Sequence, residues 1–391
     1  MAANQETRLK TDDFDWKKYP VLETFKSAAS TFVKRLDKGA QIWAASRDWF
    51  MEEWGRDTFI SLPGILLTSR RFDDAKKVFK KFARFEKNGL IPNRISNKME
   101  YNAADAPMWF IQSVKSYLKY TRDSRFVDDM LPVMRRIIGA YKNGASYEKY
   151  GEKQTIWMDE DGLIMSPAQA TWMDADCFGK QPVTPRNGKA IEINALWYDN
   201  LRFLSKLDRD YGPLADAVKK SFNKKFWNKS KKCLYDVIDG DAHGRATRPN
   251  MIFAVSHAGD LISMTRQKQI VKKVKKELLT AGGLRTLSPK DPSYKGTYDT
   301  YLPVEQKDLA YHQGTAWPWL MGAYCDALAK VGKKEEIIKA ITPLVRFCLE
   351  SPYKSLPEVF SGNPPYEPGG TTSQAWSVAE VLRVLVEHKV A

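Results

Sequence analysis

The segment "NAADAPMWFIQSVKSYLKYTRDSRFVDDMLPVMRRIIGAYK", residues 102–142, carries the clearest folding signal in this chain. Apolar side chains recur every three or four residues over 102–120 and again over 123–142, which predicts two helices. Only Thr121 and Arg122 separate the two segments. A link this short requires the helices to run antiparallel and to pack side by side. The segment therefore predicts a helical hairpin.

The same periodicity, together with helix-start and helix-stop residues, predicts about twelve helical segments and few strands. The expected segments are 20–37, 58–69, 73–88, 102–120, 123–142, 190–210, 213–228, 248–258, 265–280, 312–330, 333–350 and 371–388. Connections from an even-numbered segment to the next odd-numbered one are short, whereas the others are mostly long. Helices therefore come as tight pairs, and every long connection is expected on the same side of the molecule.

Helices paired in this way suggest six hairpins closed into a ring. The expected fold class is all-α, an (α/α)6 barrel with an inner and an outer circle of helices. The lysine-rich segments 73–88, 213–228 and 265–280 are all odd-numbered, as an outer circle requires. No obvious domain boundary occurs, so residues 1–391 are expected to form a single domain.

Composition narrows the class of protein. The chain is 43% hydrophobic and 12% aromatic, enough for a substantial core, and no apolar run reaches the ~18–20 residues of a membrane span. The polar start "AANQETRLKTDD" has no apolar stretch, which argues against a signal peptide. The four cysteines are far apart and form no C-x-x-C pair, which fits a reducing compartment. We therefore expect a cytoplasmic protein without a membrane partner.

The formal net charge of +15 raises the possibility of a nucleic-acid partner. Each lysine run, however, has lysines on one side and Val, Phe or Ile on the other at helical spacing, which is typical of a solvated outer helix face. No helix-turn-helix, zinc-finger or RNP signature accompanies the lysines. We expect no nucleic-acid partner.

Unusual polar clusters occur at the positions where the long loops and inner-helix starts would gather. They read "WGRDT" from Trp54, "YNAAD" ending at Asp105, "KAIEIN", "YHQGTAW" and "TTSQAW". Aromatic rings offer flat apolar faces to sugar C–H groups, and planar polar side chains fix hydroxyls. Five such loops at one mouth favour a sugar pocket. For "WGRDT" a second interpretation stays open, in which Asp57 caps a helix and pairs with Arg56.

Two loops offer candidate catalytic carboxyls. The stretch "SPAQATWMDAD" presents Trp172, Asp174 and Asp176 together, and an apolar tryptophan beside a carboxyl favours an acid. Calcium binding is the alternative, because "DEDG" lies upstream, but the spacing does not match an EF-hand. In "SLPEVFSGNPPYEPGG", Glu358 has an apolar setting, whereas Glu367 is expected to be exposed.

Other site types lack their signatures. The four histidines show no H-E-x-x-H or paired spacing, so we expect no metal site. No G-x-S-x-G, Walker loop or G-x-G-x-x-G occurs, which argues against serine hydrolases, NTPases and dinucleotide-binding enzymes.

A resemblance covers nearly the whole chain. The ordered motifs "WGRDTFISLPGILL", "GLIPN", "YNAADA", "TWMDA", "PVTPRNGKAIEINALWY", "GLRTLSP", "YHQGTAWPW" and "PEVFSG…QAWSVAEVLR" resemble the C-terminal glucosidase domain of glycogen debranching enzymes, from about Trp49 to the C-terminus. The resemblance implies an (α/α)6 barrel that hydrolyses the α-1,6-linked glucose at glycogen branch points. It implies an inverting mechanism without a cofactor, similar in plan to glucoamylases, and glycogen or a branched α-glucan as partner.

The resemblance also implies roles for individual residues. Asp174 corresponds to the general acid and Glu358 to the general base. The clamp on the terminal glucose corresponds to Trp54, Arg56 and Asp57. The remaining expected substrate-binding residues are Asp105, Trp172, Arg285, His312, Gln313 and Trp317.

Several alternatives stay open. Debranching enzymes normally carry an upstream domain, so we expect either a stand-alone glucosidase or part of a larger enzyme whose other domain or partner chain is missing. The barrel alone could also accept α-1,4 ends, which would make it glucoamylase-like, and a trehalase-like hydrolase shares the same ring. A non-catalytic glycan-binding barrel would need only the aromatic pocket.

Overall fold

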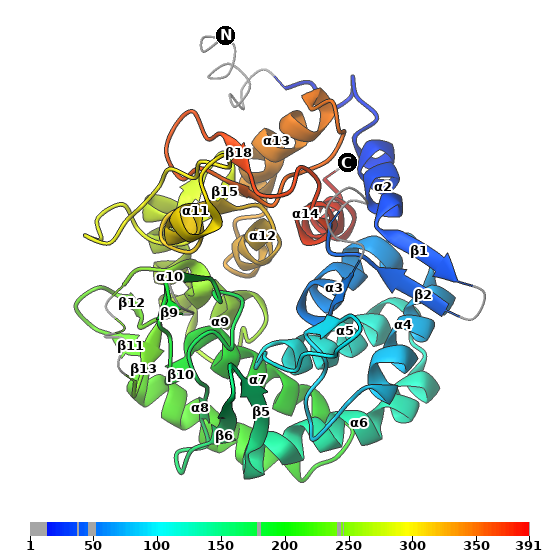
Figure 1. The fold of residues 1–391 in the computed structure, drawn as a ribbon, viewed down its shortest axis with the longest axis vertical. Helices are drawn as coiled ribbons and strands as arrows, with labels where there is room; N and C mark the ends of the chain where they lie inside the picture. Colours follow the sequence, from blue (N-terminus) through cyan, green and yellow to red (C-terminus); the bar gives the residue numbers. More distant parts are fainter. Residues whose placement is uncertain are drawn as a thin grey trace.

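A computed structural model describes residues 14–36, 39–45, 52–177, 181–240, 244 and 246–390. Trp49, near which the resemblance begins, lies outside these residues. The described chain is mainly helical, and its helices are arranged around a common centre (Figure 1). None of the described helices combines the length and the apolar character that crossing a bilayer would need.

Six helices of the described chain surround the centre in a closed cycle. Each packs against the next, and the last packs back against the first. In order they are α3 (Gly55–Leu62), α5 (Ala106–Thr121), α7 (Ile191–Leu204), α9 (Phe253–Ser256), α12 (Leu320–Lys330) and α14 (Ala375–Glu387). A π-helical turn, η1 (Pro63–Leu67), continues α3, and a 3-10 turn, η2 (Pro249–Ile252), leads into α9. Alternate helical segments of the sequence therefore face inward, as expected.

The other expected helices lie outside this cycle (Figure 1). They are α2 (Val21–Thr31), α4 (Phe72–Arg84), α6 (Ser124–Asn143), α8 (Tyr211–Lys225), α10 (Met264–Glu277) and α13 (Glu335–Glu350). In α4, Val78, Phe79 and Phe82 are buried, whereas Lys80 on the other side is exposed. The lysine-rich segments therefore form outer faces, as their spacing predicted.

The core between α3, α4 and α5 is aromatic. The ring of Phe59 lies 4.9 Å from Phe82 and 5.0 Å from Phe110, centroid to centroid, with the planes tilted edge to face. On the far side of α3, η1 approaches the backbone of α14 closely at Gly64. A Cβ atom at that position would come 1.9 Å from the carbonyl oxygen of Ala379, so only glycine allows this packing.

Short strands occupy the connections, many of them two residues long. They are β1 (Val33–Leu36), β2 (Gly39–Ile42), β3 (Glu53–Trp54), β4 (Arg94–Ile95), β5 (Ala145–Lys149), β6 (Glu152–Met158), β7 (Ile164–Met165), β8 (Asp176–Cys177), β9 (Gln181–Pro182), β10 (Lys189–Ala190), β11 (Trp227–Asn228), β12 (Cys233–Leu234), β13 (Val237–Ile238), β14 (Leu279–Thr280), β15 (Gly283–Arg285), β16 (Ala316–Trp317), β17 (Val359–Phe360) and β18 (Pro368–Gly369). The largest of the described sheets joins β14 to β18 in antiparallel order. This sheet brings together three connections that are far apart in the sequence.

The sequence-based boundaries need three corrections. The expected helix 20–37 ends at Thr31, and its last residues form β1. The expected helix 312–330 begins only at Leu320, because residues 316–317 pair with β15 and β17 instead. A short helix that was not expected, α11 (Val304–Tyr311), precedes them. At both corrected boundaries strand pairing overrides the local helical pattern.

Candidate active site

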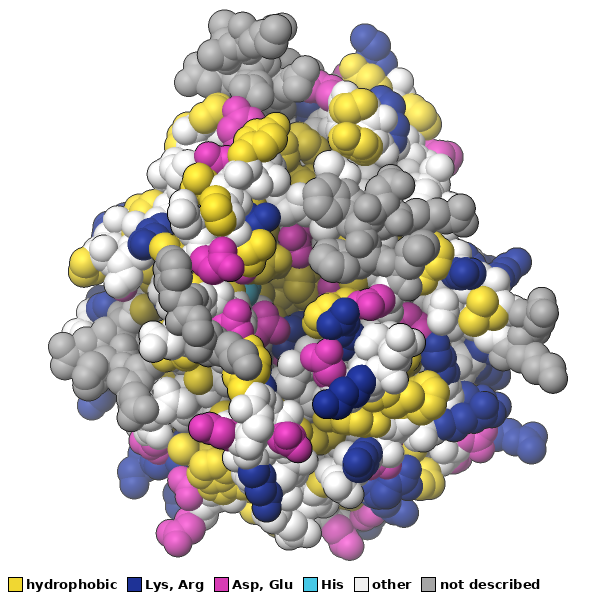
Figure 2. All heavy atoms as spheres, in the orientation of Figure 1, with side chains coloured by type: hydrophobic (Ala, Val, Ile, Leu, Met, Phe, Trp, Pro, Cys, Tyr) yellow, Lys and Arg dark blue, Asp and Glu magenta, His cyan; other side chains and the backbone are white. Residues whose placement is uncertain are grey.

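The candidate active site lies where the N-terminal ends of inner helices meet. Arg56 is in the first turn of α3, Asp105 is the N-cap residue of α5, and Gln374 is the N-cap residue of α14. Side-chain hydrogen bonds join these ends to each other and to a long connection. Figure 2 shows a hollow near the middle of the viewed face, with acidic side chains around it.

Arg56 is the centre of this cluster. Its Nε donates to Asp105 Oδ2 at 2.7 Å, and its Nη1 donates to Asp174 Oδ2 at 2.9 Å. Arg56 and Asp105 are buried, whereas the Asp174 side chain keeps 34% of its surface exposed. Arg56 Nη2 and Asp105 Oδ1 have no hydrogen-bond partner among the described residues. Buried polar atoms without a partner are costly, so both are suited to contact a polar ligand.

Asp57 lies in the first turn of α3 rather than at its N-cap position. The N-cap residue is Trp54, which makes no side-chain cap, and Asp57 instead accepts a hydrogen bond from Gln374 Nε2 at 3.3 Å. Burial raises the pKa of Asp57 to about 7, although the charge of Arg56 acts against the rise. The charge of Glu358 acts in the same direction as burial. The carboxyl groups of Asp57 and of Glu358, the candidate base, therefore interact electrostatically.

Glu358 stands just before β17, at the start of a hairpin formed with β18. Its backbone N–H donates to the carbonyl oxygen of Thr371 at 2.9 Å, and the Tyr311 hydroxyl donates to its carboxyl group. Burial raises the pKa of Glu358 to about 7, although the hydrogen bond from Tyr311 lowers it. Gly370 follows β18 directly, and a Cβ there would come 2.2 Å from Glu358 Oε2 and 2.9 Å from Glu358 Cβ, so a side chain at this position would displace the carboxyl group.

Helix α11 supplies Asp308, which the sequence reasoning missed, and Tyr311, which it included in "YHQGTAW" without a role. Asp308 and Tyr311 are three residues apart and therefore share one face of the helix. Burial raises the pKa of Asp308 to about 6, and the charges of Asp176 and Asp174 contribute to the rise. The signal was present as D-x-x-Y directly before "HQGTAW", but the expected helix began only at residue 312.

Tryptophan rings from two connections and one inner helix pack together in the site. Trp172 lies 5.3 Å from Trp317 and 5.2 Å from Trp319, centroid to centroid, and Trp376 lies 5.2 Å from Trp319. His312 stacks on Trp317 at 5.3 Å. Burial lowers the pKa of His312 well below its usual value, so its ring is neutral, and neither ring nitrogen has a partner among the described residues. The expected residues Trp172, His312 and Trp317 thus form a buried aromatic cluster.

A buried network of hydrogen bonds and ion pairs holds the Trp172 side chain in place. Its indole Nε1 donates to Asn250 Oδ1 at 2.8 Å, and Asn250 Nδ2 donates to Asp236 Oδ1 at 2.8 Å. Arg186 donates to Asp236 at 2.7 Å and to Glu192 at 2.6 Å. The sequence contained this arginine within "PVTPRNGKAIEIN" but gave no sign of its partners. The network fixes the orientation of Trp172.

The remaining expected site residues contact neighbouring loops. The Arg94 guanidinium lies 5.4 Å from the centre of the Trp54 ring. Gln313 accepts from Arg248 at 2.7 Å and donates to the carbonyl oxygen of Val183 at 3.0 Å. Arg285 Nε donates to the carbonyl oxygen of Gly362 at 2.8 Å. These contacts hold the loops around the cluster.

The acidic stretch that suggested calcium is occupied by a lysine. Asp159, Asp161 and Asp239 surround the Lys189 ammonium at 2.6, 2.8 and 2.7 Å. The Lys189 side chain is fully buried, and Lys225 pairs with Asp161 and Asp239 as a second cation, so two ammonium groups face the three carboxylates. The Lys189 ammonium stands where a metal ion would have to bind.

The sequence also matches a known family. The amylo-alpha-1,6-glucosidase family matches residues 26–383, so the match begins before the expected position 49. The glycogen debranching enzyme of Saccharomyces cerevisiae is 28% identical over 371 aligned residues. That alignment covers 71% of this chain and 24% of the yeast protein, so the chain spans about a quarter of that relative's length.

Solved structures show the same fold at low identity. The GH63 mannosylglycerate hydrolase from Thermus thermophilus gives a TM-score of 0.68 at 10% identity and covers 93% of this chain and 99% of its own. A rhamnosidase from Klebsiella oxytoca gives 0.61 at 13% identity, over 95% of this chain and 64% of its own. Because the family match spans nearly the whole sequence, this chain belongs to the amylo-alpha-1,6-glucosidase family of glycosidases.

Proposed function

We propose that this chain is an exo-acting α-glucosidase that removes α-1,6-linked glucose at the branch points of glycogen. We also propose that the two circles of helices form an (α/α)6 barrel, and that this barrel is a single domain. The observation that carries the functional proposal is Arg56, which joins Asp105 to the partly exposed Asp174 while Glu358 lies in the same electrostatic environment. Family membership and the match to a glycogen debranching enzyme support it.

The terminal glucose is held by the cluster around Arg56. Arg56 Nη2 donates to one sugar hydroxyl, and Asp105 Oδ1 accepts from a neighbouring one, because both atoms are otherwise buried without a partner among the described residues. Asp57 offers a third polar contact beside them. The tryptophan cluster supplies the apolar face of the pocket.

Asp174 is the general acid and Glu358 the general base. Asp174 protonates the departing glycosidic oxygen, and Glu358 takes a proton from a water that attacks the opposite face of the sugar. Space for that water requires a carboxyl separation of roughly 6.5–9.5 Å, the range of inverting enzymes.

Glucose release tests the proposal. The wild type is expected to release glucose from a branched limit dextrin and from panose, faster than from maltose or trehalose. Glu358→Gln is expected to abolish release, whereas Glu367→Gln in the same loop is the control, because Glu367 is exposed. Equal rates on maltose would make the enzyme glucoamylase-like, and preference for trehalose would make it trehalase-like. Glucan binding without any release would indicate a non-catalytic barrel.

A further inference from the structure

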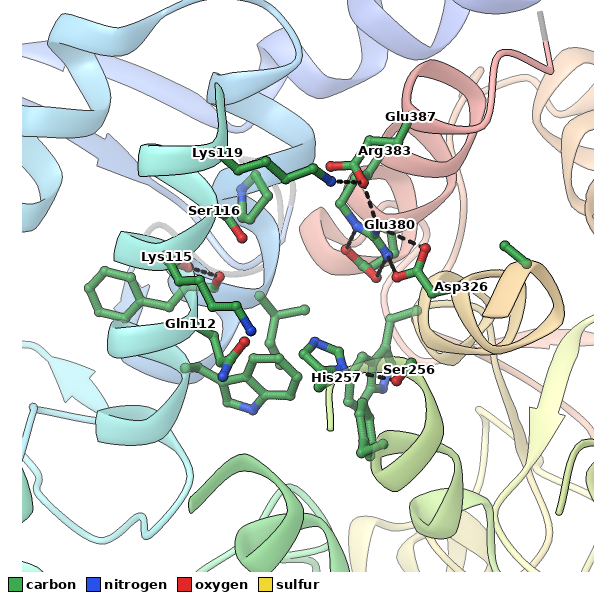
Figure 3. Close-up of a pocket in the computed structure, with 18 of the residues that line it drawn as sticks. Gln112, Lys115, Ser116, Lys119, Ser256, His257, Asp326, Glu380, Arg383 and Glu387 are labelled. Atoms are coloured by element: carbon green, nitrogen blue, oxygen red, sulfur yellow. Dashed lines mark hydrogen bonds and ion pairs between the residues drawn. The ribbon is translucent and has the colours of Figure 1, made fainter. Parts of the chain in front are cut away.

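A second cavity lies at the other end of the inner helices. Its volume is about 640 Å³, and α5, α9, α12 and α14 line it (Figure 3). Lys115 and Lys119 are in the last two turns of α5, Lys330 is the last residue of α12, and Arg383 is near the end of α14. The candidate active site uses the opposite, N-terminal ends of α5 and α14. The two sites therefore open at opposite ends of the inner helices, and Trp319, which packs on Trp172 in the candidate active site, also lines this cavity.

The acidic side chains of this cavity already have cationic partners. Arg383 donates to Glu380 at 2.8 Å, to Asp326 at 2.9 Å and to Glu387 at 3.4 Å, as the dashed lines in Figure 3 show. Lys119 lies 2.7 Å from Glu387 as a second cation. Because these carboxylates already contact cationic side chains, they do not favour a cationic ligand in the cavity.

Two lysines of the cavity, in contrast, have no carboxylate within ion-pair distance among the described residues. Lys330 and Lys334, both exposed at the rim of the cavity, make no ion pair or hydrogen bond with any described residue. Desolvation lowers the pKa of Lys330, and the charges of Asp199, Asp326 and Asp260 act against this, whereas the charge of Lys115 adds to it. Lys115 itself is bonded on one side to Asp199, and Figure 3 shows its ammonium pointing into the cavity. Of Lys115, Lys330 and Lys334, only Lys115 pairs directly with a carboxylate, so an anion in the cavity would find two ammonium groups without a direct partner among the described residues.

Neutral groups complete the lining. Burial lowers the pKa of His257 to about 4, so its imidazole is uncharged, and its Nδ1 lies 2.9 Å from Ser256 Oγ. Its ring meets the face of Trp109 edge-on at 5.3 Å. Gln112 uses its Nε2 for Asp199 and Asn200, which leaves its carbonyl oxygen as an acceptor. An aromatic wall with a neutral imidazole and an amide suits a ligand that carries hydroxyl groups.

We propose that this cavity binds a small phosphate monoester of a sugar or polyol. The phosphate lies between Lys115, Lys330 and Lys334, and the hydroxyl-bearing part lies against Trp109 and His257. A cavity of about 640 Å³ has the size of ordinary small-molecule sites. This inference does not depend on the proposed glucosidase activity, because none of these residues belongs to the candidate active site.

Calorimetric titration of the whole protein with glucose 6-phosphate, inorganic phosphate and glucose tests the proposal. Glucose 6-phosphate is expected to bind most tightly. Lys330→Met is expected to weaken its binding by about tenfold, since a charged hydrogen bond is lost. Lys330 makes no ion pair or hydrogen bond among the described residues, so this variant is expected to fold. The control is Lys339→Met, an equal charge change on the exposed face of the neighbouring helix α13, and it is expected to bind normally.

Each other result has a defined meaning. Equal binding of inorganic phosphate would support an anion site whose ligand is free phosphate rather than an ester. Glucose binding as tightly as glucose 6-phosphate would overturn the anionic ligand. No binding of any of the three compounds up to about 10 mM would overturn the site, because that is weaker than an ordinary metabolite site. Unchanged binding of glucose 6-phosphate to Lys330→Met would also overturn the site. Ala329→Phe narrows the cavity, so weaker binding to this variant is an independent check.

Discussion

Arg56 Nη1 lies 2.9 Å from Asp174 Oδ2, and so the first turn of α3 is tied to a loop 118 residues further along the chain. The Nε of the same guanidinium lies 2.7 Å from Asp105 Oδ2. One planar group therefore sets the positions of two carboxyls. A lysine cannot do this, because its ammonium lacks the fixed fork of donors.

Arg56→Lys is expected to lower kcat/KM for panose by about 100-fold or more, because the charge remains but the geometry of the clamp is lost. The melting temperature is expected to change little, since the buried carboxylates keep a cation beside them. Arg135→Lys is the matched control, because Arg135 forms an exposed ion pair with Asp208 on an outer helix. An unchanged kcat/KM in Arg56→Lys would remove Arg56 from the substrate site.

Glu358→Gln is expected to stabilise the protein at high pH only. The folded-state pKa of Glu358 is about 7, above its ordinary 4.5, so the native state binds more protons than the unfolded state between these values. Its contribution to the free energy of unfolding therefore falls as pH rises through this window. The variant avoids that loss and is expected to gain ~1–3 kcal/mol at about pH 8 and nothing at about pH 4.5. Thermal unfolding at both pH values checks this. An equal gain in the free energy of unfolding at both pH values would contradict a buried Glu358 carboxyl with a raised pKa.

Tyr311→Phe is expected to move the acid limb of the kcat/KM profile to higher pH. A base with a pKa of about 7 loses activity as pH falls through 7, and the hydrogen bond from Tyr311 lowers the pKa of Glu358. Its removal raises that pKa by up to about one unit. Asp57 also has a pKa of about 7, so the acid limb of the profile reports the joint titration of Asp57 and Glu358. A limb that stays in place would argue against Glu358 as the base.

Substrates with different leaving groups distinguish the general acid, Asp174, from the general base, Glu358. Asp174→Asn is expected to lose about 1,000-fold on panose but to retain most activity on α-glucosyl fluoride, because fluoride leaves without a proton from the enzyme. Glu358→Gln is expected to lose activity on both substrates, since the attacking water still needs a base. Initial rates on the two substrates check this. The reverse pattern would exchange the two roles.

Much of the architecture follows from local sequence pattern. The hairpin over residues 102–142 is visible because a short link between two amphipathic segments leaves one arrangement. The lysines of α4 and α8 mark outer helices for the same local reason. The strand at Ala316 was not predicted, because its pairing with β15 and β17 depends on residues far away in the chain.

The site was predictable as a set of loops but not as a set of contacts. The sequence marks "WGRDT" as unusual, yet it cannot distinguish an Asp57 that caps a helix from one that bonds Gln374, 317 residues later. It places His312 and Trp317 in the site, but their neutral, stacked and buried state depends on tertiary packing. The cavity around Arg383 leaves no local signal, because its partner Asp326 is 57 residues away on another helix.

Proton NMR of the first glucose released from panose tests the proposed inverting α-1,6-glucosidase. Attack of water on the face opposite the departing oxygen converts the α-linkage into β-glucose, so the β-anomer is expected to appear first, before mutarotation. Glu358→Gln is expected to release neither anomer. Release of α-glucose first would mean a retaining enzyme and a carboxyl separation near roughly 5–5.5 Å, and would contradict the roles assigned to Asp174 and Glu358.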